Sequence, residues 1–359
     1  MSAALDNIKA DVRALKAYTL VERETRVKLN QNESPWDLPE AVKRRVLDQA
    51  LSRPWSRYPA FDPKELLGRL AAHSGWRADG ILAGNGSNEL IEALLLVTVG
   101  PGTPVVIPEP TFTLYALLTR VLGGEPVRVR LTEELTYDVT AIREARRTRR
   151  APLTIVCSPN NPTGCSISLE DVSALCSESG GLVVVDEAYH EFAGVSAVPL
   201  LARHDNLVVL RTFSKAMALA GMRVGYLLAS PDLVVEINKG RLPYNINFIS
   251  QLAAMAAVDE WALLQERVER IVAERAALAQ ALGSLRGVRV YPSDANFLLL
   301  ELADRKPKDV LEAAFARGVL VRDVSSYPML ERCLRVSVGS PEENAALVTA
   351  LDAALHSSD

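Results

Sequence analysis

The stretch Leu207-Val208-Val209-Leu210-Arg211-Thr212-Phe213-Ser214-Lys215 passes from an apolar run into a turn of small and polar residues. Its first four residues are valine or leucine, which predicts a buried strand. A lysine just past such a strand can project into the cleft where the strands of an open sheet end. Lysine forms Schiff bases with carbonyl groups when it is partly desolvated or lies near another cation, and Arg223 is a candidate for that cation. The alternative is that both side chains are solvated, as most lysines are.

Short apolar runs alternate with helical patterns on both sides of this stretch. Strands are predicted at 104–108, 127–131, 153–158, 182–186 and 207–211, and helices at 112–122, 139–147 and 168–177. Buried strands separated by helices indicate βαβ units. We therefore expect an α/β fold whose mostly parallel sheet is covered by helices on both faces. Polar segments follow three of these strands, at the edge of the sheet where ligands bind.

A glycine-rich turn, Gly84-Asn85-Gly86-Ser87-Asn88-Glu89, precedes an apolar helix predicted at 90–99. It imitates the dinucleotide fingerprint GxGxxG, but Glu89 replaces the third glycine and no convincing strand precedes the turn. A second interpretation is a helix N-terminus whose backbone N–H groups and Ser87 hydroxyl hold a phosphate. An ordinary helix capped by Asn85 or Ser87 is the remaining alternative.

Composition excludes several classes of protein. The chain has 359 residues and a net charge of −4, which gives no electrostatic support for nucleic-acid binding. Its four cysteines show no CxxC spacing, which favours reduced thiols over disulfides or a zinc site. His190-Glu191 begins like HExxH, but Gly194 stands in place of the second histidine. With no signal peptide and no apolar run of membrane-spanning length, we expect a soluble cytoplasmic protein without a metal.

The strand ends carry the residue types that a pyridoxal-phosphate site requires. Asp186 at a buried strand end needs a cation or hydrogen-bond donors, and the pyridinium nitrogen of pyridoxal phosphate needs a carboxylate. Lys215 would form the Schiff base with this cofactor, and Phe112 could stack on its ring. The expected phosphate ligands are Ser87, Ser214 and Arg223, and the expected donors to the ring oxygen are Asn161 and Tyr189.

The remainder of the chain predicts an N-terminal arm and a second, smaller α+β domain. The arm comprises a short helix at 11–17 and a polar loop at 28–36, followed by helices at 39–51 and 63–73. Apolar residues recur from Trp261 to Leu282 with heptad-like spacing, which predicts a long helix bridging two domains. Strands at 288–291, 296–302, 319–322 and 334–338 and helices at 308–317 and 342–355 follow. We assign 1–45 to the arm and part of the small domain, 46–260 to a large cofactor-binding domain, and 261–359 to the small domain.

With these motifs the chain resembles the fold-type-I aminotransferases and, within them, the histidinol-phosphate aminotransferase family. The resemblance spans nearly the whole chain. The matching motifs are Asn30–Glu33, Ser56–Pro59, Gly84–Glu89, Ser158–Gly164, Asp186–Tyr189, Arg211–Lys215, Gly221–Gly225, Val321–Asp323 and Cys333–Gly339. The sequence differs from the family where Phe112 replaces a common tyrosine, which keeps stacking but loses a hydroxyl, and where Met217 replaces a common phenylalanine.

The resemblance implies roles for these residues. The cofactor residues carry over as stated, with Lys215, Asp186 and Tyr189 as the catalytic group. Asn88 joins the phosphate loop, and in a homodimer Tyr58 would reach the phosphate of the neighbouring subunit's cofactor. The implied substrate residues are Tyr18, Asn32, Arg322 and Arg335, of which Arg335 would grip a carboxylate or phosphate.

The implied reaction transfers an amino group between L-histidinol phosphate and 2-oxoglutarate, giving imidazole-acetol phosphate and glutamate, in histidine biosynthesis. Histidinol phosphate carries a phosphate ester where glutamate carries its α-carboxylate. A guanidinium fork donates hydrogen bonds to two oxygens of either group, so one arginine can serve both substrates. The alternative for Arg322 and Arg335 is an ordinary pair of surface charges on neighbouring strands.

Other functions fit part of this pattern. An aromatic or broad-specificity aminotransferase shares all the cofactor residues, and so does a threonine-phosphate-type decarboxylase on the same fold. A non-enzymatic regulator would be free to lose Lys215 and Asp186, and both are present. A nicotinamide-dependent dehydrogenase would show no visible colour when purified.

Overall fold

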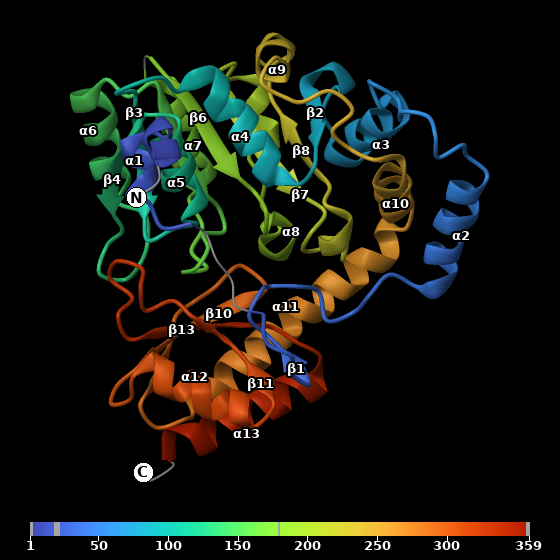
Figure 1. Ribbon diagram of the computed structural model, residues 1–359. Helices are drawn as coiled ribbons and strands as arrows, with labels where there is room; N and C mark the ends of the chain where they lie inside the picture. The colour runs from blue at the N-terminus through green and yellow to red at the C-terminus, as the bar shows by residue number, and fades with distance from the viewer. Residues whose placement is uncertain (1–2, 18–21, 179, 357–359) are drawn as a thin grey trace.

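In the computed structural model, which describes residues 3–17, 22–178 and 180–356, a seven-stranded sheet forms the centre of the larger lobe (Figure 1). The order is β2-β8-β7-β6-β5-β3-β4, and within this sheet β8 runs antiparallel to both neighbours while the other pairs are parallel. The carboxyl ends of β5, β6 and β7 therefore lie side by side. The strands are β2 (Ile81–Gly84), β3 (Pro104–Glu109), β4 (Glu125–Arg130), β5 (Leu153–Cys157), β6 (Leu182–Asp186), β7 (Leu207–Thr212) and β8 (Gly225–Leu228).

Helices cover both faces of this sheet because its strands are apolar on both sides. Along β6, Val183 and Val185 belong to one core cluster, whereas Val184 between them belongs to another. The first cluster joins the sheet to α2, α3, α7 and α10, and the second joins it to α4, α5 and α9. The helices of this lobe are α2 (Glu40–Leu51), α3 (Lys64–Ser74), α4 (Ser87–Thr98), α5 (Leu114–Val121), α6 (Val139–Arg149), α7 (Leu169–Ser177), α8 (His190–Ala193), α9 (Pro231–Asn238) and α10 (Phe248–Asp259). The α/β class expected from the alternating pattern is confirmed.

The smaller lobe contains an antiparallel sheet in the order β12-β13-β10-β9. Helix α11 connects the lobes: Leu264 packs in the core of the larger lobe, and Val268 and Ile271 pack in that of the smaller one (Figure 1). Near the N-terminus, β1 pairs in parallel with β11. The bounds are β1 (Val27–Lys28), α11 (Trp261–Gly283), β9 (Val288–Val290), β10 (Phe297–Leu302), α12 (Pro307–Ala316), β11 (Val319–Leu320), β12 (Arg322–Asp323), β13 (Cys333–Ser337) and α13 (Pro341–His356).

Several predicted segments differ from the structure. The judgement that no strand precedes Gly84 is wrong, because β2 ends at that residue and pairs with β8. The four-residue strand β8 and the helices α9 and α10 were not predicted. The residues of α10 are buried on almost every side of the helix, so its sequence has little amphipathic period. The strand expected at 319–322 is divided between two sheets, and the helix expected at 11–17 is α1 (Ala10–Arg13).

Short 3-10 helices occur at Ala3–Asn7, Ala78–Gly80, Val198–Ala202 and Ala220–Met222. Within the described ranges, the helices are all too short or too polar to cross a membrane.

Candidate active site

A cavity of about 390 Å³ lies at the carboxyl ends of β5, β6 and β7 and is closed on the other side by β12 and β13. It brings together every predicted site residue that the structure describes, except Tyr58. The predicted residues that line it are Asn32, Ser87, Asn88, Phe112, Asn161, Asp186, Tyr189, Ser214, Lys215, Arg223, Arg322 and Arg335. Residues from the N-terminal segment, the larger lobe and the smaller lobe therefore meet around one space.

Lys215 lies in this cavity, three residues beyond the end of β7. Its Nζ donates a hydrogen bond to the backbone oxygen of Gln31, 2.7 Å away. Burial, and then the positive charge of Arg335, lowers the pKa of Lys215 to about 7. A substantial fraction of this amine is therefore unprotonated near neutral pH, and the unprotonated form is the nucleophile.

Asp186 ends β6 with only 3% of its surface exposed. Its Oδ1 accepts a hydrogen bond from the backbone N–H of Ala188 at 3.1 Å, and its Oδ2 accepts one from the Tyr115 hydroxyl at 2.5 Å. Burial raises the pKa of this carboxyl group to about 6. Among the residues that the structure describes, Asp186 forms no ion pair, so a cationic ligand would supply the charge that it lacks.

The N-terminus of α4 presents groups that could bind an anion. Gly86 precedes the helix with φ +79°, and no side chain caps the first turn, so the alternative of a helix capped by Asn85 or Ser87 is wrong. Arg223 approaches this turn, and its Nη1 donates to Ser214 Oγ at 3.1 Å. A Cβ on Gly86 would lie 2.6 Å from Arg223 Nη2, so a larger residue would displace the guanidinium. Free backbone N–H groups, hydroxyls and a cation are the donors that a phosphate requires.

Arg335 on β13 joins three parts of the chain. Its Nη1 donates to Asn161 Oδ1 at 2.6 Å, and its Nη2 donates to the backbone oxygen of Asn30 at 2.7 Å. Because Oδ1 of Asn161 is engaged, the amide nitrogen is the atom of that side chain that could donate to a ligand. Arg322 on β12 lies directly opposite Arg335 in the antiparallel register, so two cations border the same cavity.

Asn32 lines the cavity, but its side chain is also bonded to protein groups. Its Nδ2 donates to the Tyr189 hydroxyl at 3.1 Å, and its Oδ1 accepts from Ser337 Oγ at 3.2 Å. Its backbone has φ +56°, a conformation that residues other than glycine adopt at an energetic cost. With its oxygen accepting from Asn32, Tyr189 keeps its own proton to donate, and burial raises the pKa of this phenol well above its usual range.

One predicted residue that the structure describes lies elsewhere. Tyr58 lies outside the cavity with 81% of its surface exposed, and its ring stacks on Tyr244 with centroids 4.5 Å apart. Tyr18 falls outside the described residues. Conversely, Tyr115 was not predicted: its place in an apolar helix, three residues after Phe112, gave no signal beyond that of an ordinary core aromatic.

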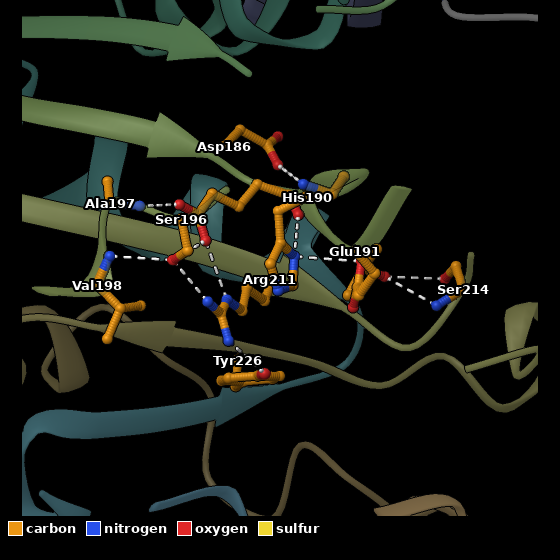
Figure 2. Close-up of polar contacts among 12 residues, drawn as sticks. Asp186, His190, Glu191, Ser196, Ala197, Val198, Arg211, Ser214 and Tyr226 are labelled. Atoms are coloured by element: carbon orange, nitrogen blue, oxygen red, sulfur yellow. Dashed lines mark hydrogen bonds and ion pairs between the residues drawn. The ribbon is translucent and has the colours of Figure 1, made fainter. Parts of the chain in front are cut away.

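A buried ion pair joins two side chains that do not line the cavity (Figure 2). Arg211 Nε donates to Glu187 Oε2 at 3.0 Å, and Arg211 Nη2 donates to Ser196 Oγ at 2.7 Å. Ser196 Oγ in turn donates to Glu187 Oε2 at 2.9 Å, and Tyr226 lies 3.4 Å from Arg211 Nη1. The pair connects the residue after Asp186 to the strand that leads to Lys215. It therefore holds the ends of β6 and β7 together without lining the cavity.

These groups fit the pyridoxal phosphate expected from the sequence. The carboxylate of Asp186 has no cationic partner in the described structure and could bind a ring pyridinium. The amine of Lys215 could bind the aldehyde, and the open turn at Gly86 could hold the phosphate. Each chemical group of the cofactor thus has a counterpart around one cavity.

Comparison with known proteins agrees with this geometry. The family model for aminotransferases of class I and II matches residues 24–351. The chain is 39% identical over 330 residues to the histidinol-phosphate aminotransferase of Chlorobaculum tepidum, covering 92% of this chain and 94% of that protein. It is 40% identical over 330 residues to the protein of the same name from Chlorobaculum parvum, covering 92% of each. The crystal structure of histidinol-phosphate aminotransferase from Sinorhizobium meliloti in complex with pyridoxal-5'-phosphate superimposes with a TM-score of 0.87 and 26% identity, covering 98% of each chain.

Replacing Arg211 by alanine should destabilise the protein by about 3–5 kcal/mol, because the buried Glu187 carboxylate loses its cation. The matched control is Arg147→Ala, which removes an arginine from the exposed pair with Glu144 and should cost at most about 1 kcal/mol. Urea unfolding of both variants measures the difference. Equal losses in the two variants would show that the buried pair is no more important than a surface one.

Capture of pyridoxal phosphate by Lys215 should accelerate as the pH rises through about 7 and then level off. The pKa of the amine is lowered, so the reactive unprotonated form predominates above that pH. Borohydride trapping at a series of pH values, followed by peptide mapping, gives both the rate and the labelled residue. The Lys215→Ala variant controls for other lysines. Label on a different lysine, or a rate that does not change between about pH 6 and 8, contradicts the assignment.

Proposed function

Since the chain belongs to the class I and II aminotransferases, we propose that it exchanges an amino group between L-histidinol phosphate and 2-oxoglutarate, with pyridoxal phosphate as its cofactor. The observation that carries this proposal is the position of Arg322 opposite Arg335 at the cavity that contains Lys215. Whole-length similarity to proteins named histidinol-phosphate aminotransferase supports it. The reaction would belong to histidine biosynthesis.

Pyridoxal phosphate, when bound, supplies an electron sink that stabilises negative charge on the substrate carbon during amino-group transfer. Lys215 would provide the amine that binds the cofactor and would hold or release a proton at Nζ during transfer. Asp186 would accept a hydrogen bond from the ring nitrogen, while Asn161 and Tyr189 would donate to the ring oxygen. The phosphate would be bound by Ser87, Asn88, Ser214 and Arg223, and the ring would pack against Phe112.

The two arginines account for the pair of substrates. Arg335 is already oriented by Asn161 and Asn30, so its guanidinium can bind a carboxylate or phosphate without much loss of side-chain entropy. A phosphate carries up to two charges and three acceptor oxygens, whereas a carboxylate carries one charge and two oxygens. Arg322 would therefore contribute more to the binding of histidinol phosphate than to that of glutamate.

We further propose that two copies of the chain form a homodimer with shared sites. Exposed apolar side chains gather on α2 and the segment after it, where Leu51, Trp55 and Phe61 are 73%, 65% and 50% exposed. Tyr58 lies in the same segment, stacked on Tyr244. Apolar patches of this kind usually mark an interface. In a two-fold dimer, Tyr58 would complete the phosphate site of the other copy.

Arg322→Ala should lower kcat/KM for histidinol phosphate about 10- to 100-fold, the loss expected for one charged hydrogen bond, and should affect phenylalanine, tyrosine and leucine less. The measurement is kcat/KM for these four amino donors in the wild type and the variant, with 2-oxoglutarate as acceptor. Arg317→Ala, an exposed arginine at the end of α12, is the control. An unphosphorylated aromatic amino acid as the best wild-type substrate would indicate an aromatic aminotransferase. Release of CO₂ from threonine phosphate would indicate a decarboxylase.

Mixing two inactive variants, Tyr58→Ala and Lys215→Ala, should restore part of the activity. In the hybrid dimer one of the two sites has both native residues, because Tyr58 and Lys215 of that site come from different copies. Activity after denaturation and refolding of the mixture, with hybrid formation checked by native mass spectrometry, tests this. Hybrids that form and remain inactive would exclude the shared site.

A further inference from the structure

The hydroxyl of Tyr115 provides one of the two hydrogen bonds that hold the Asp186 carboxylate. Tyr115 lies on α5, is fully buried, and its hydroxyl is 2.5 Å from Asp186 Oδ2. The other bond, from the backbone N–H of Ala188 to Oδ1, exists whatever residue occupies position 115. The bond from Tyr115 is therefore the one that a substitution at position 115 can remove.

Packing fixes Tyr115 in place. Its ring meets Phe112 edge to face, with centroids 5.6 Å apart, and its backbone oxygen accepts from Thr119 Oγ1 at 2.7 Å. Helix α5 also packs on β3, the strand that pairs directly with β5. A buried tyrosine held in this way cannot follow a moving carboxylate, so it restrains the carboxylate to one position.

The groups that face Asp186 come from several segments. They are Tyr115 on α5, Tyr137 before α6, Cys157 on β5, Glu187 after β6, and Tyr189. None of these five carries a positive charge, and Glu187 repels the carboxylate. Burial raises the pKa of Asp186, and the Tyr115 hydrogen bond acts in the opposite direction by favouring the ionised form.

We propose that Tyr115 is a positioning residue for catalysis, whose hydroxyl keeps the Asp186 carboxylate ionised and fixed against the ring nitrogen of the cofactor. The inference rests on the proposed function. Because Tyr115 stabilises the carboxylate, the proton shared between Asp186 and the ring nitrogen stays on the nitrogen, where it strengthens the electron sink. The phenol itself neither gives nor takes a proton in this role, since burial raises its pKa well above the usual range.

The direction of the pH effect follows from these hydrogen bonds. The carboxylate has a pKa of about 6, so the attraction for a ring pyridinium is present above that pH and is lost as the pH falls through it. Removing the Tyr115 hydroxyl raises this pKa. The pH below which the protein loses affinity for the cofactor therefore moves upward in a Tyr115→Phe variant.

The test compares Tyr115→Phe with Tyr137→Phe. Tyr137 is a matched control because its hydroxyl donates to the backbone oxygen of Cys157, the residue paired with Asp186 in the sheet, and not to Asp186 itself. The dissociation constant of pyridoxal phosphate from the apoprotein, measured by fluorescence between about pH 5 and 9, should rise roughly 10- to 100-fold in Tyr115→Phe near neutral pH. In Tyr137→Phe it should change by less than about 3-fold. With ¹⁵N-labelled cofactor, the ring nitrogen should give a protonated chemical shift in the wild type and Tyr137→Phe, and a less protonated one in Tyr115→Phe.

A double-mutant cycle separates positioning from general destabilisation. In an Asp186→Asn background, the further change Tyr115→Phe should alter cofactor affinity by less than about 3-fold, because there is no carboxylate left to hold. The inference is overturned if Tyr115→Phe has the same effect in the wild-type and the Asp186→Asn backgrounds, or if the two single tyrosine variants behave alike. A wild-type protein that fails to bind pyridoxal phosphate would instead refute the proposed function itself.

Discussion

The arrangement of the site depends on a buried carboxylate that the protein provides with no cation of its own in the described residues. Asp186 stands at the carboxyl end of β6 and is neutralised by no lysine or arginine there, so its ionised form is held by hydrogen bonds alone. Burying such a group costs free energy. In the proposed function, the cationic ring of the cofactor would offset this cost. Surrounding structure, such as the Glu187–Arg211 pair, keeps the strand ends in place.

The N-terminal segment at Asn30–Asn32 connects the two lobes at the cavity. Asn30 accepts from Arg335 of the smaller lobe, Gln31 accepts from Lys215 of the larger lobe, and Asn32 bonds to Ser337 and Tyr189. One short, polar and partly strained segment thus sets the distance between the residues proposed to bind the substrate and the amine proposed to react with it. A polar stretch of sequence without helical or strand periodicity can therefore be as important for the geometry of the site as the strands are.

Much of the site was predictable because its residues lie in short motifs next to recognisable strands. Lys215 and Asp186 each follow a run of buried apolar residues, and the family resemblance inferred from such motifs is confirmed by the whole-length comparisons. Tyr115 was missed because nothing in its own helix distinguishes it from a core aromatic. Strand β2 was rejected and β8 missed because each has only four residues, and α10 lacks a period because it is buried on most sides.

The sequence by itself determined the α/β class, the alternation of helices with strands β3 to β7 and the chemistry of the residues at the ends of β5, β6 and β7. These properties depend on local hydrophobic patterns and on residue type, which the chain carries without reference to its fold. Only the tertiary structure decided that Arg322 lies opposite Arg335, that Asn32 supports Tyr189 and that Tyr115 reaches Asp186. These partners are separated by 13, 157 and 71 positions in the chain, and such contacts arise from packing between segments, which no local pattern encodes.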